Sequence, residues 1–429
     1  MSEQAPSDGL AAREAALHLL DATLARKGGL EEAQGSSAFA RLEPRDRAFA
    51  RALVMATLRH LGPIDRALNA RLTREPPGRV RHILRLGAAQ AFWLDVPDFA
   101  AVNTSVGMAE AERPSKPFKG LVNAILRRMI ADGPPPSDPE ALAPAWLYAR
   151  WLASYGEDGP RIAAKIAEEP ATDLSLRDPA EADELAAAME AEVLPGGSLR
   201  VRQRGDITGW PGYADGRWWV QDAAAAIPTR LLNLQPGETA LDLCAAPGGK
   251  TLQMAAAGAS VVALDRSAPR LRRLKENLDR TGLTAEVVVA DAADWRDPRA
   301  FDAVLLDAPC ASTGTFRRNP DVLWAVQPAD IAKLSGVQTR LLDAAAARVN
   351  PGGRLVYCVC SLEKEEGEGQ AAEFLKRHPE FTTAPAPALP GEAGIQEASV
   401  TRQGWLRMLP HHLPGGMDGF FAARFVRNL

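Results

Sequence analysis

The sequence has few cysteines and no apolar segment long enough to span a bilayer. Only four of its 429 residues are cysteine, none lies before residue 244 and none forms a CxxC pair. Since there are also only six histidines, we expect neither a metal site nor a disulfide framework. The longest apolar runs fall far short of the ~20 residues of a membrane-spanning helix, and the first thirty residues lack the basic and apolar regions of a secretory signal. These absences predict a cytoplasmic protein with reduced thiols and no membrane association.

The sequence also lacks the excess of positive charge that is typical of nucleic-acid-binding proteins. Its formal net charge is −4, but residues 1–133 contain 19 Lys+Arg and 15 Asp+Glu, whereas the remainder contains 31 and 39. Between Arg41 and Arg85, eleven arginines accompany four acidic residues. Because affinity for nucleic acid follows local charge, this segment is a candidate RNA-binding surface, with a solvated helix face as the alternative. The arginines selected from it are Arg45, Arg51 and Arg59.

The hydrophobic pattern divides the chain into three predicted parts. Apolar residues recur at helical spacing from residue 10 to 131, which predicts an all-α domain over residues 1–133. A proline-rich linker at 132–139 follows, and residues 134–215 are predicted to form this linker and a small α+β module. Residues 216–429 are predicted to form an α/β domain.

The α/β prediction rests on apolar strands that alternate with helices. The predicted strands are 239–243, 260–265, 285–290, 301–307 and 353–358. The predicted helices between them are at about 249–257, 267–281 and 329–349. This alternation is typical of βαβ units and a mostly parallel, doubly wound, Rossmann-like sheet.

The first of these strands runs into a glycine-containing turn with the sequence DLCAAPGGKT (242–251). It does not match a phosphate-binding P-loop, because Cys244 stands where the first P-loop glycine is required, and it lacks the GxGxxG of dinucleotide-binding folds. Its glycines still allow a ligand to approach the backbone closely. The predicted cofactor-binding residues of the turn are Cys244, Ala245, Ala246, Pro247, Gly248, Gly249 and Lys250.

Acidic residues stand at the ends of the predicted strands. Asp242, Asp265, Asp291 and Asp307 each lie at or just after one of them. A single such aspartate is usually a helix N-cap, but ligands of open α/β sheets bind at the carboxyl ends of the strands. A ligand with a ribose and a positive charge fits four acids there, which favours S-adenosylmethionine.

Two cysteines are expected at the same edge of the sheet. Cys310 follows the fourth strand in DAPCASTG (307–314), and Cys360 follows the fifth in VCS (359–361). Methylation of carbon 5 of a pyrimidine requires a thiolate that adds to carbon 6, and later a base that removes the carbon-5 proton. Cys310 and Cys360 are the candidates for this chemistry, whereas Cys244 and Cys358 are interpreted as buried packing residues.

These motifs resemble those of the RsmB/NOP family of RNA (cytosine-5)-methyltransferases. Besides the two cysteine motifs and the cofactor turn, the matching segments are PGYADGRWWVQDAAAAIPTRLL (211–232) and LPHHLPGGMDGFFAARF (409–425). The helical segments AVNTSV (101–106) and GLVNAILR (120–127) resemble a NusB-like RNA-binding domain. This combination is the arrangement of the bacterial family members that modify small-subunit (16S) ribosomal RNA.

The resemblance implies roles for individual residues. Cys360 would be the attacking thiolate and Cys310 would help to resolve the adduct. Lys250 and Asp307 would hold the flipped base or the cofactor, and Asp307 is also a candidate general acid. The family usually has threonine before the nucleophile, where this chain has Val359. Cys358 lies on the same side of the strand as Cys360, so a minor alternative makes it a spare thiol.

The residues after the Cys310 motif are candidates for RNA contacts. Arg317 and Arg318 are candidate phosphate ligands and Trp324 is a candidate stacking residue, with surface charge and core packing as the alternatives. The sequence thus predicts S-adenosylmethionine-dependent methylation of a cytosine in 16S ribosomal RNA by a monomer. The same chemistry on tRNA, and a non-catalytic RNA-binding factor with a methyltransferase fold, remain alternatives.

Overall fold

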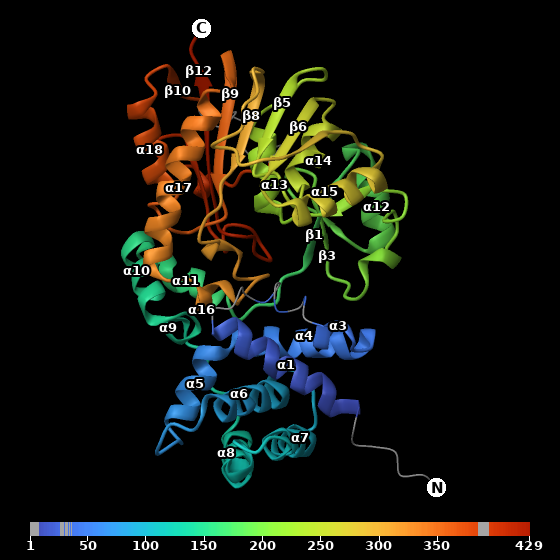
Figure 1. Ribbon diagram of the computed structural model, residues 1–429, viewed down its shortest axis with the longest axis vertical. Helices are drawn as coiled ribbons and strands as arrows, with labels where there is room; N and C mark the ends of the chain where they lie inside the picture. Colours follow the sequence, from blue (N-terminus) through green and yellow to red (C-terminus); the bar gives the residue numbers. More distant parts are fainter. Residues whose placement is uncertain (1–7, 26–29, 31–32, 34, 36, 385–393) are drawn as a thin grey trace. The chain divides into compact units, whose positions relative to one another are not determined.

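A computed structural model describes residues 8–25, 30, 33, 35, 37–384 and 394–429. The chain forms two compact units (Figure 1). The N-terminal unit contains residues 1–169 and 316–326, and the C-terminal unit contains residues 170–315 and 327–429. Among the described residues, no helix has both the length and the apolar character needed to cross a membrane.

The N-terminal unit is helical, as the sequence predicts. Its principal helices are α1 (Asp8–Leu24), α4 (Pro44–Arg59), α5 (Leu61–Asn69), α6 (Gly78–Trp93), α7 (Asp98–Ala111) and α8 (Lys119–Asp132). Shorter ones are α3 (Ser37–Ala40), α9 (Pro139–Leu142), α10 (Ala145–Tyr155) and α11 (Asp158–Ala164). Proline is well suited to the first position of α4, because the N–H that it lacks would have no acceptor within the helix. Leucines at helical spacing, such as Leu17, Leu20, Leu53 and Leu84, form the core.

A segment from the second half of the sequence completes this unit. Residues 316–326, which include α16 (Val322–Ala325), belong to it rather than to the α/β unit. The ring of Phe316 lies 5.6 Å from that of Trp151, and Trp324 Nε1 donates a hydrogen bond to the carbonyl of Leu58 at 3.0 Å. This segment is therefore packed into the helical core.

The predicted small module at 134–215 is not one body in the structure. Its helices α9, α10 and α11 belong to the N-terminal unit, whereas its strands belong to the C-terminal unit. The strands β1 (Thr172–Leu176), β2 (Glu192–Val193), β3 (Leu199–Val201) and β4 (Trp218–Val220) form an antiparallel sheet in the order β2-β3-β1-β4. Helix α12 (Ala182–Met189) packs on it through Leu185.

The larger sheet of the C-terminal unit has the order β10-β12-β9-β8-β5-β6-β7, with β11 paired to β12. Five of its strands are parallel: β5 (Thr239–Leu243), β6 (Ser260–Asp265), β7 (Glu286–Val289), β8 (Phe301–Asp307) and β9 (Val349–Val359). They confirm the predicted Rossmann-like arrangement. The antiparallel strands β10 (Phe381–Thr383), β11 (Leu406–Met408) and β12 (Phe420–Arg427) were not predicted.

Helices cover both faces of this sheet (Figure 1). On one face α17 (Pro328–Ala346) and α18 (Glu368–Arg377) pack against residues such as Leu306 and Tyr357. On the other, α13 (Ala223–Leu231), α14 (Gly249–Ala256) and α15 (Ala268–Thr281) cover residues such as Ala240 and Ala263. Burial on both faces explains why the parallel strands read as continuous apolar runs. It also leaves the carboxyl ends of β5, β6, β8 and β9 as the place where polar side chains gather.

Candidate active site

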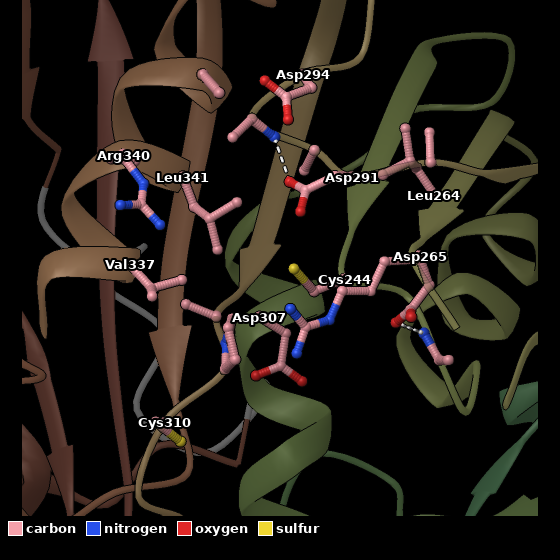
Figure 2. A pocket seen from close by; sticks show the side chains of 18 of the residues that line it. Cys244, Leu264, Asp265, Asp291, Asp294, Asp307, Cys310, Val337, Arg340 and Leu341 are labelled. Carbon is pink, nitrogen blue, oxygen red and sulfur yellow. Dashed lines mark hydrogen bonds between the residues drawn. The ribbon is translucent and has the colours of Figure 1, made fainter. Parts of the chain in front are cut away.

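A cavity of about 840 Å³ opens at the carboxyl ends of the parallel strands (Figure 2). Its lining contains predicted residues from several strand ends: Cys244, Ala246, Asp265, Asp291, Asp307, Cys310 and Cys360. Asp242 is different, because its side chain is buried and accepts a hydrogen bond from Thr251 Oγ1 at 2.6 Å. Three of the four strand-end aspartates therefore face the cavity, and the fourth fixes the turn from β5 into α14.

The turn between β5 and α14 has backbone conformations that few residues adopt. Cys244 has φ = 63° and Gly248 has φ = 115°. A Cβ atom on Gly248 would lie 2.4 Å from Leu274 Cδ1, so only glycine fits there. Cys244 and Ala246 line the cavity, and Ala245, Pro247, Gly248 and Gly249 form the rest of the turn.

Asp265 at the end of β6 is held in a fixed orientation by backbone donors. Its Oδ2 accepts from the N–H of Ala246 at 3.1 Å and its Oδ1 from that of Ser267 at 2.8 Å. Figure 2 shows the first of these bonds, and also the bond from the N–H of Ala293 to Asp291 Oδ1. The site thus presents carboxylates in fixed positions at the ends of two neighbouring strands.

The sequence analysis missed five charged residues that line the cavity: Arg266, Arg270, Asp294, Arg340 and Asp343. Arg270 on α15 donates to the carbonyl of Ala246 at 2.5 Å, and Arg340 on α17 and Asp294 after β7 also belong to the lining. Arg270 and Arg340 lie within ordinary amphipathic helices, so no signal in the sequence separated them from surface charge. Asp294 stands three residues after Asp291, outside the strand-end pattern.

The buried Lys250 and the partly exposed Asp307 form an ion pair at the cavity. Lys250 Nζ lies 2.7 Å from Asp307 Oδ2 and 5.2 Å from the centre of the Phe420 ring. Burial alone would lower the pKa of Lys250, but the carboxylate of Asp307 more than offsets it and raises the pKa. The other oxygen of Asp307 accepts from Cys358 Sγ at 3.7 Å. Asp307 therefore connects a permanent cation to a buried thiol.

The two cysteines that the sequence singled out lie together. Their Sγ atoms are 3.6 Å apart, and Ser312 Oγ lies 3.6 Å from Cys360 Sγ and 3.9 Å from Cys310 Sγ. The hydrogen bond from Cys310 lowers the pKa of Cys360, aided by Ser312 and the charge of Lys250. The same bond, together with burial, raises the pKa of Cys310. These opposite directions favour the thiolate form at Cys360 over that at Cys310.

The remaining two cysteines resemble Cys310 rather than Cys360, because their pKa values are raised. Burial, and then the nearby aspartates, raise the pKa of Cys244 and of Cys358. Val359 lies on the other side of β9 from Cys358, in the apolar core with Leu306 and Leu355. Valine therefore suits this position sterically, although the family usually has threonine there.

The arginines predicted to bind RNA have different environments. Arg59 is 5% exposed and donates to the carbonyls of Ile166 (2.9 Å), Glu168 (2.8 Å) and Arg317 (2.8 Å). Arg317 is itself 2% exposed. Arg59 and Arg317 are thus buried structural residues, and the expectation that they contact phosphates is wrong.

The other RNA candidates differ in exposure. Trp324 is hydrogen-bonded to the carbonyl of Leu58 in the helical core, which favours core packing over base stacking as its role. Arg318 is half-buried, whereas Arg45 and Arg51 on α4 are exposed. Much of the local positive charge is also neutralised, because five further arginines of the 41–85 segment form ion pairs: Arg66, Arg71, Arg79, Arg81 and Arg85. The basic surface is smaller than the sequence suggested.

Comparisons with known proteins agree with this architecture. Residues 10–131 match the NusB family, and residues 229–426 match the family described as 16S rRNA methyltransferase RsmB/F. The chain is 34% identical to ribosomal RNA small subunit methyltransferase B of Pseudomonas putida, covering 97% of this chain and 98% of that protein. The chain belongs to the RsmB/F family.

Another RsmB/F relative, ribosomal RNA small subunit methyltransferase B of Xylella fastidiosa, is 36% identical over 99% of both chains. Among solved structures, that of PH0851 matches 99% of this chain and 100% of its own, with a TM-score of 0.76 and 25% identity. A methyltransferase homolog protein from Pyrococcus horikoshii matches 66% of this chain and 95% of its own, with a TM-score of 0.56 and 26% identity. The similarity to the Xylella fastidiosa protein and to PH0851 thus covers both units of the chain.

Proposed function

We propose that this protein transfers a methyl group from S-adenosylmethionine to carbon 5 of a cytosine in 16S ribosomal RNA, in the cytoplasm. The observation that carries the proposal is the pair of thiols, Cys310 and Cys360, 3.6 Å apart at the lining of the cavity. One thiol is needed to attack the pyrimidine and a second group is needed to release it. The names of the relatives in Pseudomonas putida and Xylella fastidiosa support ribosomal RNA of the small subunit as the substrate.

The cavity fits S-adenosylmethionine in size and in chemistry. Its volume lies within the range of about 300–1,000 Å³ of small-molecule sites. Asp265 at the end of β6 is oriented to accept the hydroxyl groups of a ribose, and Asp291, Asp294 and Asp307 suit positively charged groups. When bound, S-adenosylmethionine supplies a methyl group activated by its sulfonium.

Residues of the chain carry out the remaining steps, which are addition to carbon 6 and release of the product. The thiolate of Cys360 forms a bond to carbon 6 of the cytosine, and the displaced electron pair raises the electron density at carbon 5, where the methyl group is received. A base then takes the carbon-5 proton, the electron pair of that C–H bond forms the double bond between carbons 5 and 6, and the bond from Cys360 Sγ to carbon 6 breaks, which regenerates the thiolate. We assign Cys310 to this release, since it is the thiol in contact with Cys360.

Lys250 and Asp307 assist at the same edge of the sheet. The Lys250 ammonium lies close enough to favour the Cys360 thiolate, and its bond to Asp307 holds that carboxyl beside the cavity. We assign Asp307 to the polar edge of the flipped base or to the cofactor. Because it is paired with Lys250 as a carboxylate, it must first take up a proton before it can act as general acid at the ring nitrogen. Arg45 and Arg51 on α4 are the exposed residues that we assign to RNA phosphates.

Bisulfite mapping of RNA from a strain lacking the gene tests this function. We expect loss of one 5-methylcytosine from 16S ribosomal RNA, restored by the wild-type gene and not by Cys360→Ala. If no 5-methylcytosine disappears from 16S ribosomal RNA, the proposal is wrong. Loss from tRNA alone would assign the same chemistry to the tRNA alternative.

A further inference from the structure

A buried carboxylate joins the two cysteine loops. Glu366 lies between β9 and α18, and its side chain is 0% exposed. It accepts hydrogen bonds from three groups: the N–H of Ala311 (3.0 and 3.2 Å to the two oxygens), Gln338 Nε2 (3.0 Å) and Ser361 Oγ (2.5 Å). Both carboxylate oxygens therefore accept hydrogen bonds.

The positions of these partners connect Glu366 to the reacting thiols. Ala311 directly follows Cys310 in the loop after β8, and Ser361 directly follows Cys360 at the end of β9. One carboxylate thus holds the residue next to each sulfur atom. Gln338 on α17 ties the arrangement to a helix, because its Nε2 also donates to the carbonyl of Pro309 at 3.0 Å.

We propose that Glu366 is a positioning residue for the two-cysteine reaction, which holds Cys310 and Cys360 at the separation where one thiol donates a hydrogen bond to the other. The inference rests on the proposed function, because it presumes that both thiols take part in the reaction. A buried carboxylate suits this task, since hydrogen bonds to a charged acceptor are stronger than those between neutral groups.

The charge of Glu366 acts in the same direction as its geometry. The hydrogen bond to Cys360 and burial are the larger reasons why the pKa of Cys310 is raised, and the negative charge of Glu366 adds to them. Burial raises the pKa of Glu366 itself, whereas its donors from Ser361, Ala311 and Gln338 favour the ionised form. Glu366 thereby helps to keep the proton on Cys310 and the negative charge on Cys360.

The effect of Glu366→Gln follows from these donors. An amide has one oxygen in place of two, so one of the groups that now donates to Glu366 would face an NH₂ group instead. We expect the loop after β8 to shift relative to the end of β9, because one of the two acceptor oxygens that hold them together is lost. The two thiols would then no longer differ as strongly in protonation.

The test compares full-length wild type with Glu366→Gln, and uses Glu373→Gln on α18 as the control. Glu373 is an exposed glutamate paired with Lys376, so its variant removes the same charge from a nearby segment. Iodoacetamide is the probe, and mass spectrometry reports how fast Cys360 and Cys310 are alkylated. In Glu366→Gln we expect the preference for Cys360 to fall about fivefold, and kcat on 16S ribosomal RNA to fall about tenfold with KM nearly unchanged. The control should match wild type.

The outcomes separate this inference from the proposed function. If folded Glu366→Gln keeps both the alkylation preference and kcat of wild type, the inference about Glu366 is wrong. If deletion of the gene removes no 5-methylcytosine from 16S ribosomal RNA, the proposed function fails, and the alkylation preference still tests the role of Glu366. If Glu366→Gln does not fold, Ser361→Ala can be tested instead, because it removes one of the hydrogen bonds to Glu366. A smaller shift of the alkylation preference in that variant supports the inference, and no shift overturns it.

Discussion

The Sγ atoms of Cys310 and Cys360 lie 3.6 Å apart although 50 positions separate the residues in sequence. The parallel pairing of β8 with β9 brings them together, since it places Asp307 opposite Cys358 and sends both following loops to the same edge. The hydrogen bond between them makes the two thiols unequal, because it raises the pKa of Cys310 and lowers that of Cys360. This inequality leads to the first two predictions.

Replacement of either cysteine should give opposite effects on a covalent intermediate. With Cys310→Ala, the adduct between Cys360 and RNA should form and accumulate, because its release is slowed. With Cys360→Ala, no adduct should form, since the attacking thiolate is absent. Denaturing gel electrophoresis of the protein with 16S ribosomal RNA and S-adenosylmethionine detects the adduct. An adduct in Cys360→Ala would mean that Cys310 or Cys358 attacks, and would reverse the assignment.

The reactivity of Cys360 should extend to lower pH than that of an ordinary thiol. Its pKa is lowered by the hydrogen bond from Cys310, with Ser312 and Lys250 acting in the same direction. Above this lowered pKa the thiolate predominates, and reactivity is lost as the pH falls through it. Iodoacetamide alkylation of Cys360 as a function of pH measures the midpoint.

Two variants show whether these neighbours cause the shift. Ser312→Ala and Lys250→Met should each move the midpoint for Cys360 toward higher pH, because each removes a group that stabilises the thiolate. Arg266→Gln, a change at the cavity lining on the side of β6, serves as the control and should leave the midpoint in place. A wild-type midpoint at or above that of a small thiol would contradict the prediction.

Arg45 and Arg51 should contribute to RNA binding through charge. Replacing both by glutamine should weaken binding to 16S ribosomal RNA and reduce the slope of log K against log salt by about 1 for each phosphate that is no longer neutralised. The matched control is Arg66→Gln, because Arg66 is exposed but paired with Asp138 and Glu140. An equal loss of affinity per arginine in the double variant and in Arg66→Gln would indicate general charge rather than a surface on α4.

Arg59 should matter for stability rather than for RNA contacts. Its guanidinium holds three carbonyl groups, those of Ile166, Glu168 and Arg317. Arg59→Met should lower the free energy of unfolding by about 3 kcal/mol, since those buried acceptors lose a charged donor. Chemical denaturation measures the change, and Arg66→Met at an exposed ion pair should cost less than about 1 kcal/mol. A change of that small size in Arg59→Met would show that the buried contacts contribute little.

Several parts of the fold could be predicted because they depend on local patterns. The helices of the N-terminal unit follow from leucines at helical spacing, and the parallel strands follow from apolar runs that end in aspartate. Strand β12 could not be predicted in the same way, because its partner β9 lies far earlier in the sequence and pairing depends on the folded sheet. The place of residues 316–326 in the helical unit could not be predicted for a similar reason. Arg317 has the sequence character of a surface residue, but it is buried in the helical unit.

The sequence by itself determined the chemistry available to this protein: a glycine-containing turn, strand-end aspartates and the cysteines of two motifs, each set by neighbouring residues. Only the tertiary structure decided which of these groups meet. It brings Cys310 and Cys360, which the sequence had singled out, into contact, buries Asp242 behind the turn and places Glu366 between the two loops. It also buries Arg59, which the sequence had assigned to the basic surface. The physical reason is that burial and hydrogen bonding fix the charge of a side chain, and both are properties of contacts between residues distant in sequence.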